Sequence, residues 1–383
     1  MEIIGIICEY NPFHNGHLYH IKQIKKKFPD SIIILVMSGN FLERGEVSII
    51  NKWDKTKIAL NYGINLVVEL PFQFATQAAD IFAFGAIKIL EALHVDKLIF
   101  GSECNDIRLL SKLADIQLEN SEFENKVKEY MDKGSNYPTA MSKALNDITG
   151  STVNSPNDIL GLSYIKEIKK QKSNIKPITI KRTSNYKSIE LNKKIVSALS
   201  IREAIKNKIS IENFVPKYSL KFIDTNINMD KYFPLLKYKI ISEIDSLNKY
   251  QSVDEGIENR IKKQVYLCNN MEDFIKAIKT KRYTYNKIQR MLMHILCGFT
   301  KEEATKLKEN VYVRILGFDE TGKKYLNEIK KTIMIPVISN YSTSKGLLDL
   351  EFRVNAIYAS IFDYQKQCDL IELERQSKPI MKI

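Results

Sequence analysis

The first half of the chain alternates short apolar runs with amphipathic stretches. Residues 3–9 and 32–37 are nearly continuous apolar runs rich in isoleucine, which is typical of strands buried on both faces of a parallel sheet. The other runs of this kind are residues 66–70, 97–100 and 176–182, and the helix-compatible stretches between them are residues 16–28, 52–62 and 78–93. Strands that alternate with helices at this spacing predict βαβ units with right-handed crossovers. The pattern therefore predicts an α/β fold built on a doubly wound parallel sheet.

Helical patterns interrupt this alternation and later replace it. Residues 106–150 look helical and acidic, and from residue 201 helical periodicity dominates, for example over residues 285–296. A chain of 383 residues also exceeds the usual domain size of about 100–200 residues. We therefore expect two domains, an α/β domain at residues 1–205 and a mostly α-helical domain at residues 206–383.

The composition is that of a globular protein, with 44% hydrophobic and 27% charged residues. The longest apolar runs are far shorter than the roughly 18 residues that a membrane-spanning helix needs, so we expect no span and no membrane partner. The N-terminus shows neither the basic segment nor the cleavage site of a secretory signal. The five scattered cysteines include no Cys-x-x-Cys pair and favour reduced thiols. These features predict a cytoplasmic protein.

The net charge of +13 is unevenly distributed along the chain. Residues 1–150 carry a slight excess of Asp and Glu, whereas residues 151–350 carry the whole basic excess. Lys and Arg gathered in one part of a chain favour a polyanionic partner such as nucleic acid. A generally lysine-rich composition is the alternative explanation.

Three of the five histidines, His14, His17 and His20, fall within seven residues directly after the first predicted strand. Open α/β sheets bind their ligands at such strand-to-helix turns. Gly16 allows the backbone to approach a ligand closely, and a helix N-terminus favours negative charge. The turn therefore predicts a site for a triphosphate, at which donors stabilise charge during attack on the α-phosphorus. A zinc site without a third ligand is a weaker alternative, and histidines that only begin a helix are another.

The segment His14-Asn15-Gly16-His17 resembles the HxGH signature of the nucleotidyltransferase superfamily, which implies a Rossmann-like sheet of that type. The longer segment of residues 9–18 resembles the tRNA(Met) cytidine acetate ligase family. Further segments similar to this family are residues 37–41, 44–46, 52–54, 68–72, 100–103, 155–161 and 282–284. The resemblance spans most of the chain.

The resemblance implies an ATP-dependent ligase. Acetate is activated as acetyladenylate, and the acetyl group passes to N4 of the wobble cytidine of elongator tRNA(Met). It implies His14 and His17 as catalytic residues and ATP as a substrate. Mg²⁺ is expected with the ATP, because a divalent cation is usual in triphosphate chemistry. The implied ATP-binding residues are Ile7, Cys8, Glu9, Tyr10, Asn11, Pro12, Phe13, His14, Asn15, Gly16, His17, Leu18, Tyr19, His20, Gly101, Asn157 and Arg182.

Four of these positions are also interpreted from their residue type and their place in the predicted elements. Gly101 follows a predicted strand, where glycine permits close approach of a nucleotide. Arg182 ends a strand beside Lys181, a good position for gripping a phosphate. Either Asn157 or Asp158 could cap the following helix, and the resemblance implies Asn157 as the nucleotide contact, because the family usually has two asparagines there and Asp158 departs from that pattern. The thiol of Cys8 adjoins the turn and is expected to pack within the strand.

Residues 196–202 resemble the second superfamily motif, ISSTxIR, and end at Arg202. In that motif a hydroxyl and an arginine reach the β- and γ-phosphates. Ala198 and Leu199 replace the usual serine and threonine, so the hydroxyl would have to come from Ser197 or Ser200.

The basic second half contains candidate tRNA contacts that interleave with Tyr283 and Tyr285, a mixture suited to phosphates and unpaired bases. These contacts are Lys281, Arg282, Lys287 and Arg290. A solvated helix face is the alternative for these side chains.

Two other functions stay open at this stage, a small-molecule adenylyltransferase and a noncatalytic RNA-binding protein. The former would not need the long basic second half, and the latter would have no use for His14 and His17. The sequence contains no Walker-type phosphate loop and no dinucleotide-binding Gly-x-Gly-x-x-Gly after the first strand.

Overall fold

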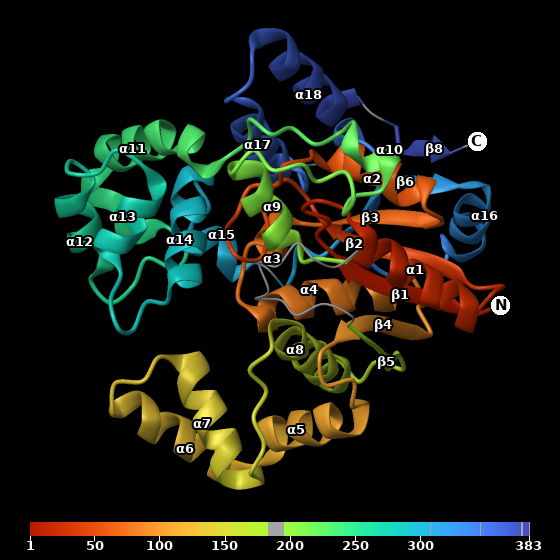
Figure 1. The fold of residues 1–383 in the computed structure, drawn as a ribbon, viewed down its shortest axis with the longest axis horizontal. Helices are drawn as coiled ribbons and strands as arrows, with labels where there is room; N and C mark the ends of the chain where they lie inside the picture. The colour runs from red at the N-terminus through yellow and green to blue at the C-terminus, as the bar shows by residue number, and fades with distance from the viewer. Residues whose placement is uncertain (183–194, 307, 345, 377, 383) are drawn as a thin grey trace.

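The computed structural model describes residues 1–182, 195–306, 308–344, 346–376 and 378–382. Its centre is one sheet with the strand order β5-β4-β1-β2-β3-β6-β7, in which β8 also pairs with β6 (Figure 1). The five parallel strands are β1 (Ile3–Cys8), β2 (Ile32–Ser38), β3 (Leu66–Leu70), β4 (Lys97–Ser102) and β5 (Lys176–Lys181). Their positions confirm the α/β fold predicted from the apolar runs.

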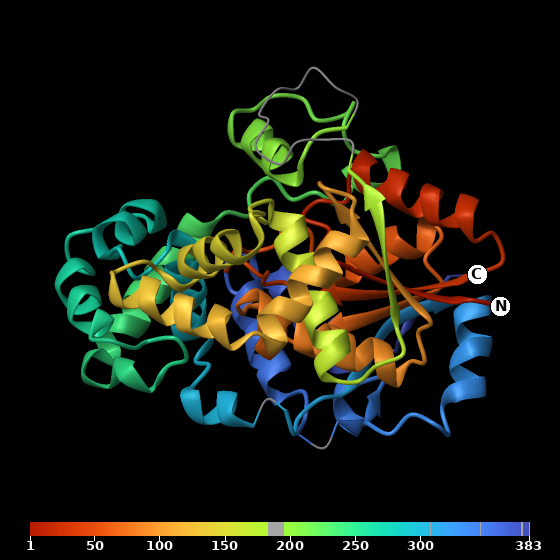
Figure 2. The ribbon, with the colours of Figure 1, turned by 90° about the horizontal axis from the view of Figure 1, so that it is seen from below.

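The apolar runs form strands because the sheet is covered on both faces. All residues of β2 and β3 are buried, so side chains that are mostly isoleucine, leucine and valine occupy both faces of each strand, with Glu69 of β3 as the charged exception. Figure 2 shows the sheet nearly edge-on with helices on either side. The helices that follow the first four strands are α1 (Asn15–Lys27), α2 (Lys52–Asn61), α3 (Phe72–Ala75) with α4 (Ala79–Ala92), and α5 (Ile107–Glu119) to α8 (Pro156–Lys170).

The sheet also takes strands from the second half of the chain. Strand β6 (Val313–Asp319) pairs antiparallel with β3, and β7 (Val337–Ile338) and β8 (Ile380–Lys382) pair parallel with β6. These strands were not predicted, because β6 is a single apolar run among helices and its partner lies about 250 residues away in sequence. The boundary expected at residue 205 therefore does not separate the sheet from the rest of the chain.

Two helical groups project beyond the end of the sheet that lies opposite the N-terminus (Figure 1). The α5–α7 arm consists of α5, α6 (Ser121–Asp132) and α7 (Tyr137–Thr149). The α11–α14 lobe consists of α11 (Phe233–Ser242), α12 (Ile257–Gln264), α13 (Met271–Ile278) and α14 (Tyr285–Cys297). The remaining helices are α9 (Ala198–Lys206), α10 (Lys217–Leu220), α15 (Lys301–Thr305), α16 (Glu320–Ile329), α17 (Asp349–Ala359) and α18 (Tyr364–Gln376), with short 3₁₀ turns at Met229–Tyr232, Ile244–Lys249 and Tyr341–Thr343. Within the described ranges, no helix has the length and apolar character needed to cross a membrane.

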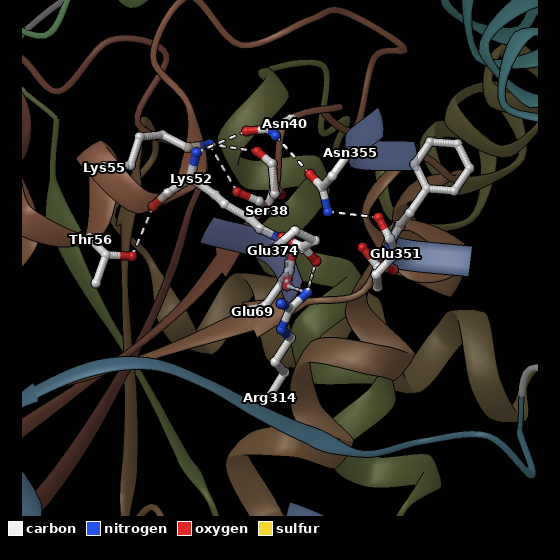
Figure 3. Close-up of polar contacts among 12 residues, drawn as sticks. Ser38, Asn40, Lys52, Lys55, Thr56, Glu69, Arg314, Glu351, Asn355 and Glu374 are labelled. Carbon is white, nitrogen blue, oxygen red and sulfur yellow. Dashed lines mark hydrogen bonds and ion pairs between the residues drawn. The ribbon is translucent and has the colours of Figure 1, made fainter. Parts of the chain in front are cut away.

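A buried network of charges ties the end of the chain to the first strands (Figure 3). Lys52 Nζ lies 2.9 Å from an oxygen of Glu69 and 2.9 Å from an oxygen of Glu374. The guanidinium of Arg314 contacts the same two carboxylates, at 2.9 and 2.5 Å. All four side chains are at most 2% exposed. Two cations and two anions therefore compensate one another at the junction of α2, β3, β6 and α18.

Two more buried ionisable groups surround this network. Burial raises the pKa of Glu351 to about 8, so that this carboxyl group is held neutral while it accepts a hydrogen bond from the Phe72 amide at 2.6 Å. Burial lowers the pKa of Lys55 to about 7. Its ammonium group donates to the carbonyl oxygens of Glu9, Ser38 and Gly39 at 2.7–3.0 Å. Lys55 thereby joins the segments that follow β1 and β2.

We predict that Arg314→Met lowers the free energy of unfolding by about 3–5 kcal/mol, because two buried carboxylates would then share one cation. Lys306→Met removes an exposed lysine 3.7 Å from Glu302 and serves as the control, with an expected change below about 1 kcal/mol. Urea unfolding of both variants measures the difference. Equal effects would show that the buried network contributes no more than a surface pair.

Candidate active site

A cavity of about 530 Å³ opens at the carboxyl end of β1, beside the point where the strand order turns from β1 to β4. Open α/β sheets bind ligands at this topological switch point. The cavity is lined from the histidine turn, the segment after β2, the ends of β4 and β5, and the starts of α8, α9 and α14. Segments spread over almost 300 residues therefore meet at one site.

Most of the residues predicted for ATP line this cavity. They are Ile7, Cys8, Glu9, Tyr10, Asn11, His14, Gly16, His17, Tyr19, His20, Gly101, Asn157 and Arg182. Burial raises the pKa of the Cys8 thiol to about 12, so this thiol remains protonated and unreactive.

Four predicted residues of the same segment, Pro12, Phe13, Asn15 and Leu18, are not part of the cavity lining. The buried ring of Phe13 stacks on Tyr62 with 5.0 Å between ring centroids. The Asn15 side chain donates to the carbonyl oxygen of Asn213 at 2.8 Å. Leu18 packs against the main core. For Phe13, Asn15 and Leu18, these contacts hold the turn in place.

His14 and His17 form a reciprocal cap at the start of α1. Nδ1 of His14 accepts the Gly16 amide hydrogen at 2.9 Å, and Nδ1 of His17 accepts the His14 amide hydrogen at 3.2 Å. A neutral ring that accepts at Nδ1 carries its proton at Nε2. The two ring centroids lie 3.9 Å apart, so the turn presents two adjacent Nε2–H donors.

The surroundings keep both imidazoles neutral. Burial, together with the charges of Arg182 and Arg202, lowers the pKa of His14 to about 3. Burial, followed by the adjacent His14 ring and Arg182, lowers the pKa of His17 well below its ordinary value. The histidines therefore act as hydrogen-bond donors of fixed orientation rather than as cations.

Glycine is required at position 16 because the His14 ring lies against it. A β-carbon there would lie 2.7 Å from Cε1 and 2.9 Å from Nδ1 of His14. Any larger residue would have to displace the ring and break its cap. The glycine of the motif thus acts by making room for His14 as well as for an approaching ligand.

Arg182, Arg202 and Arg290 are among the arginines that line the cavity, and each of these three comes from a distant segment and pairs with a carboxylate. Arg202 on α9 lies 2.6 Å from Glu46 and also donates to the Asn11 carbonyl oxygen at 2.8 Å. Arg182 after β5 lies 3.5 Å from Glu103, and Arg290 on α14 lies 3.2 Å from Glu43. The pairs hold guanidinium groups, the preferred partners of phosphate, beside the Nε2–H donors.

The structure separates Asn157 from Asp158. Asn157 lines the cavity and donates to Glu103 at 2.6 Å, while its amide oxygen accepts from Arg182 at 3.4 Å. Asp158 is buried and accepts the backbone amides of Glu103 and Cys104 at 3.1 and 3.0 Å. Asp158 therefore shapes the loop after β4, and Asn157 is the one available to a ligand.

Gly101 and the start of α9 also adjoin the site. A β-carbon on Gly101 would lie 3.2 Å from Cγ of Arg182, so this glycine gives the arginine stem its room. Ser197 lines the cavity and caps α9 by accepting the Ser200 amide hydrogen at 3.1 Å. Of the two hydroxyls considered for the second motif, that of Ser197 is the one in the lining.

The four residues predicted for tRNA occupy three different surroundings. Lys281 and Arg282 are exposed in the turn between α13 and α14. The ammonium group of Lys287 lies 3.9 Å from the centroid of the Tyr283 ring. Arg290 lines the cavity, as described above.

Several lining residues were not among the predicted site residues, although some of them lie in segments noted for their resemblance. Glu43, Arg44 and Glu46 follow β2, and their place at the carboxyl edge of a central strand was the available signal. Thr284, the N-cap of α14, lies in the segment 282–284 noted for its resemblance, whereas Asn286 on α14 had no signal, because its helix reaches the cavity only through the fold. Among the described residues, no group of three or more His, Cys, Asp or Glu side chains could hold a metal ion.

Comparison with known proteins identifies the class of this site. Residues 1–371 match the family model described as HIGH Nucleotidyl Transferase, so the sheet and its histidine turn are those of a nucleotidyl transferase. The chain is 40% identical over 400 aligned positions to the tRNA(Met) cytidine acetate ligase of Anoxybacillus flavithermus, covering 99% of this chain and 100% of that relative. It belongs to the tRNA(Met) cytidine acetate ligase family, which confirms the resemblance seen in the sequence.

Solved structures agree with this membership. The apo crystal structure of Thermotoga maritima TmcAL superposes with a TM-score of 0.92 at 31% identity, covering 100% of this chain and 99% of the other. The structure of TmcAL from the same organism bound with alpha-thio ATP superposes with a TM-score of 0.90 at 31% identity and the same coverage.

We predict that the neutral state of His14 makes stability depend on pH. An unfolded chain protonates this histidine near pH 6.5, whereas the folded chain does so only near pH 3. The stability that depends on neutral His14 is therefore present above pH 6.5 and is lost as the pH falls toward 3. Urea unfolding at pH 7 and pH 5 should show a loss of stability that is about 1–2 kcal/mol smaller in His14→Asn than in the wild type, since His17, His20 and His294 also have lowered pKa values and contribute to the loss in both proteins. An identical loss in the variant would contradict this assignment.

We predict that Gly16→Ala displaces the His14 ring, because the new methyl group would lie 2.7 Å from it. Binding of an ATP analogue, measured by calorimetry, should weaken by roughly tenfold or more, the effect of losing one or two oriented donors. The ¹⁵N chemical shifts of the His14 imidazole should report loss of the Nε2–H tautomer. Wild-type binding with wild-type shifts would show that the site tolerates the methyl group.

Proposed function

We propose that this protein is an ATP-dependent ligase that activates acetate and acetylates N4 of the wobble cytidine of elongator tRNA(Met). The observation that carries the proposal is the cavity itself. Two neutral Nε2–H donors and several guanidinium groups, including those of Arg182, Arg202 and Arg290, line it, in a chain similar over its whole length to ligases of that name.

The first step is formation of acetyladenylate. An oxygen of acetate attacks the α-phosphorus of ATP, the bond from that phosphorus to the bridging oxygen breaks, and pyrophosphate leaves. His14 and His17 are the proposed catalytic residues, because their Nε2–H groups can donate to oxygens on which charge develops. Their neutral state suits this role, since they need no proton to be lost or gained.

The arginines are suited to the phosphates that leave. Arg182 and Arg202 approach the histidine turn closely enough to influence the pKa of His14, so a phosphate held by the histidines would also feel both guanidinium groups. Asn157, which is bonded to Arg182, completes the proposed ATP contacts at the start of α8. Mg²⁺ stays a prediction, as the usual counterion of a triphosphate.

The second step transfers the acetyl group. N4 of the cytidine attacks the acetyl carbon, the carbon–oxygen bond to AMP breaks, and N4 loses a proton. Glu9 lines the cavity beside the histidine turn, and burial raises its pKa to about 7. A carboxylate with this pKa is suited to accept such a proton near neutral pH.

The two functional parts of the proposal correspond only roughly to the expected domains. The catalytic part is the sheet with its histidine turn within residues 1–205. The tRNA-binding part is the basic α11–α14 lobe, to which Lys281, Arg282, Lys287 and Arg290 belong, and not the whole of residues 206–383. A small-molecule adenylyltransferase and a noncatalytic RNA-binding protein are not favoured, because the relatives that match over the full length carry the ligase name.

The direct test is incubation with ATP, labelled acetate and total tRNA, followed by nucleoside analysis. We expect label in N4-acetylcytidine of elongator tRNA(Met), with release of AMP and pyrophosphate. Label in no nucleoside, or release of pyrophosphate only with a phosphorylated small molecule, would refute the proposal.

We predict that His17→Ala lowers acetate-dependent ATP–pyrophosphate exchange by roughly 100-fold or more, the cost of losing one preorganised donor. His94→Ala is the matched control, because His94 is exposed and bonds Thr332 at 2.8 Å, outside the cavity lining. The control should keep wild-type exchange. Wild-type exchange by His17→Ala would remove this residue from the mechanism.

A further inference from the structure

A second groove adjoins the active-site cavity between the α5–α7 arm and the α11–α14 lobe. It has a volume of about 720 Å³ and is lined by Asn136, Lys276, Lys279, Lys281, Thr284 and Tyr285, among others. Figure 1 shows the turn between α13 and α14 facing the arm that carries Asn136 at the start of α7. The groove is therefore lined mainly by the α11–α14 lobe, and Asn136 contributes from the arm.

The groove and the cavity meet at Thr284, which lines both. The two residues that follow Thr284 line different spaces, with Tyr285 in the groove and Asn286 in the cavity. On the arm, Asn136 likewise lines the groove and Pro138 lines the cavity. A chain-like ligand in the groove would consequently have its next unit at the mouth of the active site.

The lining carries positive charge that the protein itself leaves largely uncompensated. Lys276 pairs with Glu272 at 2.7 Å, but no carboxylate of the described residues lies within ion-pair distance of Lys279 or Lys281. All three lysines are on α13 or in the turn that follows it. The groove therefore suits a ligand with regularly spaced negative charges.

Exposed aromatic rings accompany these charges. Tyr285 is 39% exposed although it lines the groove, and Tyr137, between Asn136 and Pro138, is 49% exposed. Exposed tyrosines beside lysines are the means by which proteins hold unpaired nucleotides, through stacking on bases and contact with phosphates. Duplex RNA keeps its bases inside the stack and cannot use these rings.

We propose that this groove holds an unpaired RNA strand, with a base stacked on Tyr285 and phosphates on Lys279 and Lys281, so that the adjacent nucleotide enters the active site past Thr284. The inference rests on the proposed function and adds to it the path by which the RNA reaches the cavity. Arg290 pairs with Glu43 inside the cavity, so it would lie near the nucleotide in the active site and not along the groove.

The test compares two RNA probes with four variants of the full chain. One probe is a hairpin with a seven-nucleotide unpaired loop that contains cytidine, and the other is a blunt duplex of similar length. The variants are Tyr285→Ala, Tyr285→Phe, the double variant Lys279→Gln with Lys281→Gln, and the control Tyr238→Ala. Tyr238 is 74% exposed on α11 of the same lobe and does not line the groove.

We expect Tyr285→Ala to weaken binding of the hairpin by roughly 5- to 150-fold, whereas Tyr285→Phe and Tyr238→Ala bind as wild type. Binding of the duplex should not respond to Tyr285→Ala. The double lysine variant should reduce the slope of log K against log salt for the hairpin by roughly 1.4, since each single-stranded phosphate contact contributes about 0.7.

Two results would overturn the inference. One is hairpin binding by Tyr285→Ala at wild-type strength, and the other is an equal loss of hairpin and duplex binding. Acetate-dependent ATP–pyrophosphate exchange by the wild type, measured without RNA, tests the proposed function separately. Absence of that exchange would refute the ligase, whereas normal exchange and tRNA acetylation with no effect of Tyr285→Ala would refute only the groove.

Discussion

The buried contact of Lys52 and Arg314 with Glu69 and Glu374 determines how the two halves of this chain fit together. Lys52 and Glu69 belong to the first α/β units, whereas Arg314 and Glu374 arrive from strand β6 and helix α18. Removal of any one of the four would leave a buried charge uncompensated. The network therefore places β6 against β3 and joins the end of the chain to the centre of the sheet.

This junction has consequences for the active site. The α11–α14 lobe lies in sequence between β5 and β6, two strands of the sheet, so the polypeptide that contains it is anchored to the sheet on both sides. Helix α14 consequently begins over the cavity, where it supplies Thr284, Asn286 and Arg290. A contact far from the chemistry thus positions side chains that the histidine turn alone could not provide.

The cavity combines neutral donors with cations that are already compensated. His14 and His17 are neutral because burial and neighbouring arginines oppose their protonation, and their caps orient the free Nε2–H groups. Arg182, Arg202 and Arg290 are each held in place by an ion pair with a glutamate. A phosphate that enters would compete with these carboxylates for donors whose directions are set in advance.

Local patterns in the sequence determined the parallel strands and the histidine turn. A strand that is buried on both faces is recognisable as an apolar run in the sequence, and the reciprocal cap of the turn needs only residues 14–17. The same locality explains what could not be predicted. Strand β6 depends on a partner about 250 residues away, and Asn157 is distinguished from Asp158 only by the loop after β4, which occupies the aspartate. Arg290 was predicted for RNA from its basic neighbours, yet the fold turns it into the cavity toward Glu43. Consecutive residues therefore determine the chemistry of the histidine turn. The residues from distant segments that join the turn were decided only by the tertiary structure, because charge pairing and burial act between segments that are far apart in the sequence.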